Sequence, residues 1–443
     1  MVHAISLRLR IEEEDLRILL IRPRPHQETI GLQSVMICEP LELMQLAAVL
    51  RANHHEVQIV DMILEKKAVE HFISEFRPQL VGITGYISHI GIMKEYAQRI
   101  KKIDKDIHVV VGAVHATVCP EDFICDFIDY VARSAEDLYE VANCQDTSTR
   151  YADRSLPSRY TDKYYYLFAN KCALIKTSFG CPYNCNFCFC KEISPYKART
   201  IDDVITELLQ IPQKEVYIVD DDFLFNRDRL LEFAAKLRVN KIEKNFLVYG
   251  RADFIAANED IIEILSDVGL GAVIVGIEAA SQNELDQFNK RSKLEDNEKA
   301  VSILKKYGVE CYATVILGVD WDKNDFRNLY HYLKRLGLVF VNLQPFTPMP
   351  GTPYFCQYKD RLIIPYEEHE KWDMAHLVIK PEKITIGRYY LEILKLYYKI
   401  TLMPRNVIYM FKRYGVKTTL KLSIGAGQIS WQYIKKMFGG SRA

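Results

Sequence analysis

The sequence lacks the long apolar run that a membrane-spanning helix needs. Hydrophobic residues make up 49% of the 443 residues, but charged residues interrupt them before the roughly 20 that cross a bilayer. Near the N-terminus, Arg8, Arg10 and an acidic cluster interrupt any apolar core of a signal peptide. The eleven cysteines are an odd number, with several in one short segment, which does not fit the disulfide framework of a small secreted fold. We therefore expect a cytoplasmic globular protein of two or three domains.

The sequence also lacks a net charge, but this balance hides an asymmetry. The last 62 residues, 382–443, hold twelve Lys and Arg residues and two acidic residues, while the remainder carries 46 basic and 56 acidic residues. A basic tail rich in aromatic residues favours an anionic neighbour. We expect either peripheral contact with the inner face of a membrane through an amphipathic helix, or a helical lid packed on the acidic body. Nucleic acid is the competing anion, and we do not expect it as a partner.

Residues 1–145 alternate strand-like and helix-like segments. Runs such as Val109–Val111 are apolar without alternation, which is typical of parallel strands covered by helices on both faces. The pattern predicts an α/β domain with a doubly wound, Rossmann- or flavodoxin-like parallel sheet. Ligands of such sheets bind beyond the carboxyl ends of the strands, here in the loops Arg22–Met36, Thr84–His89 and Gly112–Cys119.

A polar linker is expected over residues 146–168, before a second alternating series. Residues 169–355 contain six strand–helix units, which predict a partial (β/α)6 barrel of the TIM type with its chemistry at the carboxyl ends of the strands. Residues 356–443 are basic and predicted to be mostly helical. We expect this last region to contact the substrate as a lid, or to contact a membrane.

Three cysteines follow the first strand of the predicted barrel at C-x3-C-x2-C spacing: Cys181, Cys185 and Cys188. A loop of this length can direct three thiolates to one iron–sulfur cube and leave its fourth iron without a protein ligand. The alternatives are a zinc site or cysteines without a shared role, but zinc prefers four closed ligands and no paired CxxC completes them. Cys190 is a candidate fourth ligand, but two residues beyond Cys188 we expect it to face away from the other thiols or to have a role linked to the substrate.

The motif, its place after the first strand and the barrel that follows resemble the radical S-adenosylmethionine superfamily. The N-terminal domain resembles the cobalamin-binding domain of one large branch of that superfamily. The likeness covers roughly residues 16–355 and rests on the phrases GCPYNCNFC, VDDDFLFN, GRADFI, GIEAASQ and TPMPGTP. It implies a [4Fe-4S] cluster on the three cysteines, with S-adenosylmethionine chelated to the open iron. One-electron reduction would then yield a 5′-deoxyadenosyl radical that abstracts hydrogen from a substrate.

The resemblance also implies S-adenosylmethionine contacts at the strand ends. They fall on Phe187, Asp220, Asp221, Asp222, Arg251, Glu278, Gly318 and Gln344. The three aspartates would meet the methionine ammonium and Glu278 the ribose hydroxyls, while Gln344 would edge the substrate pocket. Each position has a structural alternative: a helix N-cap for the aspartates, a salt bridge for Arg251 and Glu278, and a plain turn for Gly318.

Cobalamin is the third implied cofactor, with Tyr86, His89 and Gly112 as candidate contacts. The D-x-H-x-x-G pattern that supplies a cobalt ligand in many cobalamin domains is missing around His26. Ala113 stands where the branch commonly has a second glycine, and its side chain could crowd a buried nucleotide tail. The alternative is a vestigial domain that acts as a structural lid.

The resemblance implies an enzyme that acts at an unactivated carbon, through methyl transfer or through cyclisation or rearrangement. A non-catalytic iron–sulfur protein that binds S-adenosylmethionine for regulation is the alternative from another class. The expected partners are a small-molecule, lipid or peptide substrate and an external electron donor such as a flavodoxin or ferredoxin.

Overall fold

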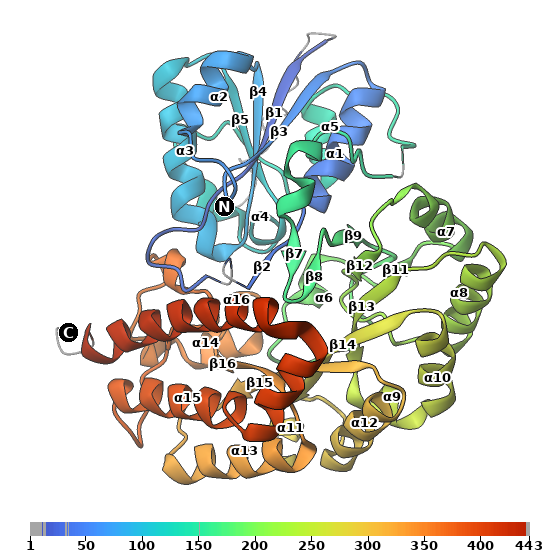
Figure 1. Ribbon diagram of the computed structural model, residues 1–443. Helices are drawn as coiled ribbons and strands as arrows, with labels where there is room; N and C mark the ends of the chain where they lie inside the picture. The colour runs from blue at the N-terminus through green and yellow to red at the C-terminus, as the bar shows by residue number, and fades with distance from the viewer. Residues whose placement is uncertain (1–10, 12–14, 32, 34, 150, 440–443) are drawn as a thin grey trace. The chain divides into compact units, whose positions relative to one another are not determined.

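The computed structural model describes residues 11, 15–31, 33, 35–149 and 151–439 (Figure 1). Arg8, Arg10 and the end of the basic tail from residue 440 lie outside the described residues. The chain forms two compact units. The first, called the N-terminal unit, contains the residues up to Thr29 together with Glu39–Lys163 and Tyr366–Asp373. The second, called the barrel unit, contains Ile30–Cys38, Tyr164–Pro365 and the residues from Met374 onward.

The N-terminal unit is built on a five-stranded parallel sheet in the order β3-β1-β4-β5-β6. The strands are β1 (Arg17–Arg22), β3 (Glu56–Asp61), β4 (Leu80–Thr84), β5 (His108–Gly112) and β6 (Tyr130–Val131). Helices α2 (Val69–Phe76) and α3 (Ile90–Ile103) cover one face, and α1 (Leu41–Ala52) and α5 (Ala135–Val141) cover the other (Figure 1). This double cover explains why every residue of β4 is buried.

The barrel unit contains a six-stranded parallel sheet whose strands follow their order in the sequence. They are β9 (Ala173–Ile175), β12 (Glu215–Ile218), β13 (Asn245–Arg251), β14 (Leu270–Glu278), β15 (Glu310–Leu317) and β16 (Phe340–Pro345). The two end strands, β9 and β16, are not hydrogen-bonded to each other. The sheet is therefore a partial barrel.

Helices with an apolar and a polar face cover the outer side of this sheet. They are α7 (Ile201–Gln210), α8 (Arg227–Val239), α10 (Glu259–Asp267), α12 (Leu294–Lys306) and α13 (Lys323–Leu336). The side chains of Thr200, Asn226 and Asp322 accept hydrogen bonds from the backbone N–H groups of the first turns of α7, α8 and α13. The apolar faces of these helices pack against the strands and form one hydrophobic core with them.

Two further helices complete the barrel unit: α15 (Ile386–Thr401) and the long α16 (Pro404–Gly439). They pack against each other (Figure 1), and Gly415 breaks the helical geometry of α16 with a φ of 76°. No helix among the described residues combines the length and hydropathy of a membrane span. The α/β class, the doubly wound sheet, the partial barrel and the helical C-terminal region are confirmed.

The expected linker over residues 146–168 is divided between the two units. Residues 146–163 belong to the N-terminal unit and residues 164–168 to the barrel unit. In the barrel unit, β7 (Tyr165–Tyr166) pairs with β2 (Met36–Ile37) and β8 (Ala169–Asn170) in a small antiparallel sheet.

Candidate active site at the strand ends

The cysteine loop begins beyond β9 and its backbone is tightly constrained. Gly180 has a φ of +67°, and a Cβ atom there would lie 2.4 Å from the Ser194 carbonyl oxygen, so the residue before Cys181 must be glycine. Asn186 donates its backbone N–H to the Phe288 carbonyl at 3.0 Å. Asn289 donates its side-chain amide to the Asn184 carbonyl at 2.7 Å. The loop is therefore tied to the segment that follows β14 and α11 (Gln282–Gln287).

The three thiols of the loop are free and partly buried. Burial raises the pKa of the Cys181 thiol to about 11, whereas a hydrogen bond from Cys190 lowers the pKa of Cys188 to about 7. Thiols with raised pKa values stay protonated until a metal displaces the proton. Three sulfur donors in one constrained loop fit an iron–sulfur cluster that keeps one iron open.

Cys190 does not face away from the cluster loop. It begins the short helix α6 (Cys190–Ile193), and its thiol donates to the Asp221 carboxylate at 3.7 Å. The Cys188 sulfur is the alternative acceptor for its single S–H proton. Cys190 is therefore committed to hydrogen bonds, although it remains close to the three candidate ligands.

The three aspartates after β12 have different surroundings. Asp220 is buried and accepts hydrogen bonds from the Thr177 N–H (2.6 Å), the Thr177 hydroxyl (2.6 Å) and the Ser178 hydroxyl (2.7 Å). These contacts join the ends of β9 and β12, so Asp220 has a structural role. Asp222 is 4% exposed, and neither of its carboxylate oxygens has a hydrogen-bond partner.

The unpartnered carboxylate of Asp222 is the strongest sign of a missing ligand. Burial raises the pKa of Asp222 to about 8, although Lys290 and Arg251 favour its charged form. A buried polar group without a partner is costly, and a bound cation would remove that cost. Of the three aspartates, Asp222 is the one with two buried carboxylate oxygens that lack a hydrogen-bond partner among the described residues.

Arg251 ends β13 and is almost fully occupied by protein partners. It binds both carboxylate oxygens of Asp253 at 2.9 Å and donates to the Lys290 carbonyl. Its guanidinium carbon lies 4.0 Å from the centroid of the Tyr183 ring, and one nitrogen lies 3.8 Å from the Cys185 sulfur. Arg251 therefore positions the cysteine loop, which favours the structural alternative for this residue.

Glu278 ends β14 and forms a buried ion pair with Lys290, which the sequence analysis missed. The Lys290 ammonium donates to the Glu278 carboxylate at 2.8 Å. Glu278 has a φ of +61° at a register shift in the pairing of β14 with β15. A Cβ atom at Gly276 would lie 2.2 Å from the Glu278 carboxylate oxygen, so this glycine is required. In the sequence, Lys290 is one of three cations in the run Lys290-Arg-Ser-Lys293, and no local signal distinguishes it.

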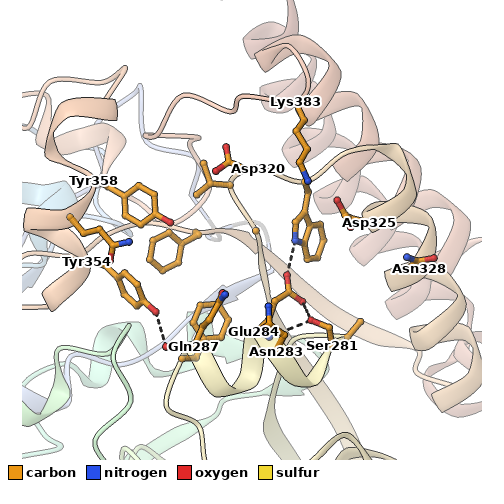
Figure 2. Close-up of a pocket in the computed structure, with 17 residues that line it drawn as sticks. Ser281, Asn283, Glu284, Gln287, Asp320, Asp325, Asn328, Tyr354, Tyr358 and Lys383 are labelled. Atoms are coloured by element: carbon orange, nitrogen blue, oxygen red, sulfur yellow. Dashed lines mark hydrogen bonds between the residues drawn. The ribbon is translucent and has the colours of Figure 1, made fainter.

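A cavity of about 750 Å³ lies beyond β14 and β15 (Figure 2). Phe288, Phe346 and Gly318 contribute to its wall, together with polar side chains of α11 and of the segment around Tyr354. The Phe288 ring meets the Phe187 ring edge to face at 5.3 Å between centroids. The cavity thus adjoins the cysteine loop through this aromatic pair.

Gly318 and Gln344 lie on neighbouring strand ends in the same region. A Cβ atom at Gly318 would lie 2.1 Å from the Trp321 indole nitrogen, so the glycine makes room for Trp321. Gln344 lies on β16, paired with Ile316 of β15. The structure therefore brings Phe187, Asp222, Glu278 and Gly318 to one side of the barrel sheet, at the carboxyl ends of its strands.

The candidate cobalamin contacts lie at the carboxyl edge of the N-terminal sheet. Tyr86 is 60% exposed, and its backbone N–H donates to the His89 imidazole at 3.3 Å. Burial lowers the pKa of His89 to about 4, so its imidazole is neutral at pH 7. Gly112 ends β5, and Ala113 follows with a φ of +88°. That backbone favours glycine, so Ala113 keeps a glycine-type conformation.

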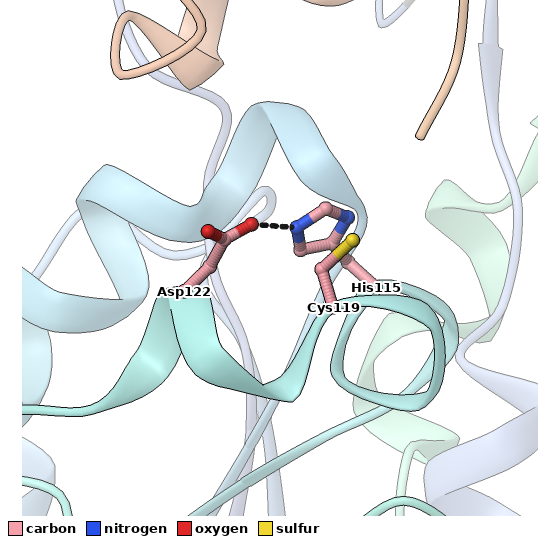
Figure 3. Close-up of side chains that lie close together, drawn as sticks. All are labelled: His115, Cys119 and Asp122. Carbon is pink, nitrogen blue, oxygen red and sulfur yellow. Dashed lines mark hydrogen bonds and ion pairs between the residues drawn. The ribbon is translucent and has the colours of Figure 1, made fainter. Parts of the chain in front are cut away.

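A second cluster in the N-terminal unit contains His115, Cys119 and Asp122, which Figure 3 shows side by side. The His115 imidazole lies 2.6 Å from the Asp122 carboxylate, and the Tyr366 hydroxyl donates to the same oxygen at 2.5 Å. Tyr366 also forms a hydrogen bond with Cys119. This network explains why the segment Tyr366–Asp373 belongs to the N-terminal unit, and we assign it a structural role.

The Glu278–Lys290 pair generates a first prediction. Lys290→Met leaves a buried carboxylate without its cation, and we expect it to lower the free energy of unfolding by about 3–5 kcal/mol. Glu278→Gln in addition to Lys290→Met removes the stranded charge and should recover much of that loss. Urea unfolding of the ligand-free protein measures both values. Strictly additive effects of Glu278→Gln and Lys290→Met would contradict a direct interaction.

Comparison with known proteins agrees with this geometry. A family model described as "B12 binding domain" matches residues 28–142, and one described as "Radical SAM superfamily" matches residues 175–333. The hopanoid C-3 methylase of Methylococcus capsulatus is 23% identical over 86% of this chain and 79% of its own length. The anaerobic magnesium-protoporphyrin IX monomethyl ester cyclase of Rubrivivax gelatinosus is 24% identical over 84% of this chain and 75% of its own length.

Among solved structures, the fold resembles the radical S-adenosylmethionine methyltransferase TsrM from Kitasatospora setae, whose structure holds cobalamin and a [4Fe-4S] cluster. The TM-score is 0.66 at 15% identity, over 96% of this chain and 99% of that one. The matched regions coincide with the doubly wound sheet and the partial barrel, in the same order. The chain belongs to the radical S-adenosylmethionine superfamily, in the branch that carries a B12-binding domain ahead of the radical barrel.

Proposed function

We propose that this protein is a cobalamin-dependent radical enzyme that transfers a methyl group to an unactivated carbon of an organic substrate. The observation that carries the proposal is the unpartnered Asp222 carboxylate beside a constrained loop of three free thiols. When bound, the reduced cluster supplies the electron that splits S-adenosylmethionine and produces the hydrogen-abstracting radical, and cobalamin supplies the methyl group.

The residues of the barrel unit would hold these groups in distinct ways. Cys181, Cys185 and Cys188 would bind three irons of the cluster, while Asp222 would accept the methionine ammonium. Lys290 uses one N–H on Glu278, and an ammonium has three donors, so it has capacity for the methionine carboxylate. The polar cavity bounded by Phe288 and Gly318 would take the adenosine portion and exclude water from it.

The loops beyond β1, β4 and β5 would hold cobalamin in the N-terminal unit. Tyr86 is the exposed candidate for the lower face of cobalt, and His89 offers a neutral imidazole nearby. Gly112 permits a close approach of the chain at the end of β5, because a Cβ atom there would lie 3.3 Å from the Ala132 carbonyl oxygen. The exposure of Tyr86 supports these roles, since much of the residue is accessible to a ligand at the carboxyl edge of the sheet.

Cyclisation is the second candidate function, because one of the similar proteins is a magnesium-protoporphyrin IX monomethyl ester cyclase. Both reactions start with the same radical and need the same barrel residues. They differ in the use of cobalamin as a methyl carrier. Absence of corrinoid from an active protein would exclude methyl transfer, whereas cyclisation proceeds either with the help of cobalamin or without it.

The proposal includes two partners. The cluster needs one electron for each turnover, which a flavodoxin or ferredoxin would supply. The basic C-terminal region would bring the enzyme to the inner face of a membrane, where a lipid or another apolar substrate is available. A hopanoid C-3 methylase among the similar proteins supports the lipid class of substrate.

The cluster ligands generate a prediction with a matched control. Cys181→Ala, Cys185→Ala and Cys188→Ala should each abolish the cluster absorbance after anaerobic reconstitution, and with it the reductive formation of 5′-deoxyadenosine. Cys190→Ala should keep the cluster, because its thiol is committed to Asp221 and Cys188. A stable cluster in any of the first three variants would refute the ligand assignment. A full cluster without 5′-deoxyadenosine would favour the regulatory alternative.

Asp222 can be tested against its neighbour Asp221. Asp222→Asn removes the charge that meets the ammonium and should weaken S-adenosylmethionine binding by about 1.5–3 kcal/mol, or one to two decades in Kd, with the iron content unchanged. Asp221→Asn should leave the affinity within about threefold, since Asp221 accepts from Cys190. Isothermal titration of the reconstituted proteins gives both values.

The same Asp222→Asn variant should be more stable than the wild type without ligand at neutral pH. The pKa of Asp222 is raised to about 8 in the folded protein, whereas the same carboxyl group in the unfolded chain has a pKa of about 4. Between these two pH values the folded protein holds a proton that the unfolded chain has released, so the free energy of unfolding falls as pH rises from about 4 to 8. The variant should lose this part of the pH dependence. Equal affinity and equal stability in both proteins would return Asp222 to a structural role.

Corrinoid content tests methyl transfer itself. Protein prepared with hydroxocobalamin should retain about one corrinoid per chain after desalting, because the exposed Tyr86 and the loop at Gly112 provide its site. Gly112→Val should lower the retained amount, since the added side chain meets the Ala132 carbonyl. Visible spectra and cobalt analysis give the stoichiometry. If the protein holds no corrinoid and still forms 5′-deoxyadenosine, methyl transfer through cobalt is excluded and cyclisation or rearrangement replaces it.

A further inference from the structure

Helix α16 carries an unusual share of the exposed apolar surface. Fifteen large hydrophobic side chains are exposed in the described part of the chain, and six of them lie on α16, between Ile408 and Trp431. Within the second half of α16, the exposed ones are Val416 (61%), Leu420 (53%), Ile424 (67%) and Trp431 (58%). Scattered apolar residues on a surface are normal, but a concentration of this kind marks an interaction site.

These four side chains form one stripe. They are spaced by four, four and seven residues, and residues at such spacings lie on the same face of a helix. The opposite face of α16 is occupied, because Tyr433 is buried against Tyr390 of α15 at 5.7 Å between ring centroids. The stripe therefore points away from the body of the barrel unit.

Lysine side chains border the apolar stripe, and residues 393–439 contain no acidic residue. Residues 393–439 contain nine Lys and Arg residues and no Asp or Glu. Lys417 and Lys435 are 18 residues apart, or five helical turns, and so lie on one line along the helix. The Lys435 ammonium lies 5.9 Å from the Trp431 ring, which places a cation at the edge of the apolar stripe.

We propose that the outer face of α16, with Val416, Leu420, Ile424 and Trp431 at its centre, binds flat on an anionic lipid surface. A lipid surface has an apolar acyl region below its anionic headgroups. The apolar side chains of the stripe would enter the acyl boundary, while the lysines beside it would contact the lipid phosphates. A second protein would need acidic residues around an apolar groove. The break at Gly415 divides α16 and lets its second half carry this face separately.

This inference deepens the membrane contact included in the proposed function, but it does not depend on methyl transfer. The substrate class that it favours is a lipid or other apolar molecule dissolved in a membrane. Binding of α16 to lipid needs no cluster, and formation of 5′-deoxyadenosine needs no lipid. A failure of one proposal is therefore distinguishable from a failure of the other.

The chain carries its own spectroscopic probe for the test. It has three tryptophans, of which Trp321 and Trp372 are buried and Trp431 is exposed. Vesicles of phosphatidylcholine with about one-third phosphatidylglycerol should shift the emission of the full chain to shorter wavelength as Trp431 leaves water. Trp431→Phe should remove the shift, and vesicles of phosphatidylcholine alone should give much less of it.

Two pairs of substitutions measure the contribution of the stripe. Leu420→Gln with Ile424→Gln should reduce cosedimentation with the anionic vesicles by about tenfold or more. Leu209→Gln with Val239→Gln is the matched control, because these side chains are equally exposed on α7 and α8 (60% and 79%). Lys417→Gln with Lys435→Gln should weaken binding by about 25-fold at low salt, at roughly fivefold for each cation. Formation of 5′-deoxyadenosine should be unchanged in all of these variants.

Three outcomes would overturn the proposal. The first is equal binding of the control pair and the stripe pair. The second is a Trp431 shift that follows protein concentration without vesicles, which would identify a second copy of the chain as the occupant. The third is binding to single-stranded RNA that competes with the vesicles and does not depend on Leu420 and Ile424, which would identify a purely electrostatic surface.

Discussion

The barrel unit depends on how it buries charge at the carboxyl ends of its parallel strands. Arg251 ends β13, Glu278 ends β14, and Asp222 follows β12, and all three are almost completely excluded from water. A low-dielectric site strengthens each pairing and makes each unpaired charge costly. Arg251 with Asp253 and Lys290 with Glu278 form two pairs. Asp222 is the carboxylate that these cations leave without a hydrogen-bond partner among the described residues, and burial accordingly raises its pKa to about 8.

The cysteine loop is held in place by contacts of its backbone. Its thiols are partly buried, and backbone contacts hold the loop that carries them. Gly180 permits a tight approach to the Ser194 carbonyl, and Asn186 and Asn289 tie the loop to the segment after β14. Arg251 reaches the Cys185 sulfur from the end of β13. The same segment carries Lys290, so the position of the loop and the charge balance of the site are linked through one connection.

The C-terminal helices have two chemically different faces. The inner face of α15 and α16 contributes Tyr389, Tyr390 and Tyr433 to the barrel core, and the Tyr389 hydroxyl donates to the Gly318 carbonyl at 2.9 Å. The outer face of α16 presents apolar and basic side chains to its surroundings. The packing of these helices on the barrel and the exposed stripe of α16 therefore use different residues, because opposite faces of a helix are chemically independent.

The sequence by itself determined the two α/β units and the cysteine motif. The apolar runs of the parallel strands and the spacing of Cys181, Cys185 and Cys188 each lie within a short segment of the chain. Such local patterns can be recognised from the sequence without the tertiary structure. Ser134, which caps α5, and Asn226, which caps α8, are local signals of the same kind.

Only the tertiary structure decided which charges of the site have partners. Three adjacent aspartates look equivalent in the sequence, but Asp220 joins two strand ends, Asp221 meets Cys190, and Asp222 is alone. Lys290 is twelve residues from Glu278, and no periodicity connects the two positions. Pairing of this kind depends on the register of β14 and on the path of the chain after α11, which are properties of the packed sheet and not of any short segment.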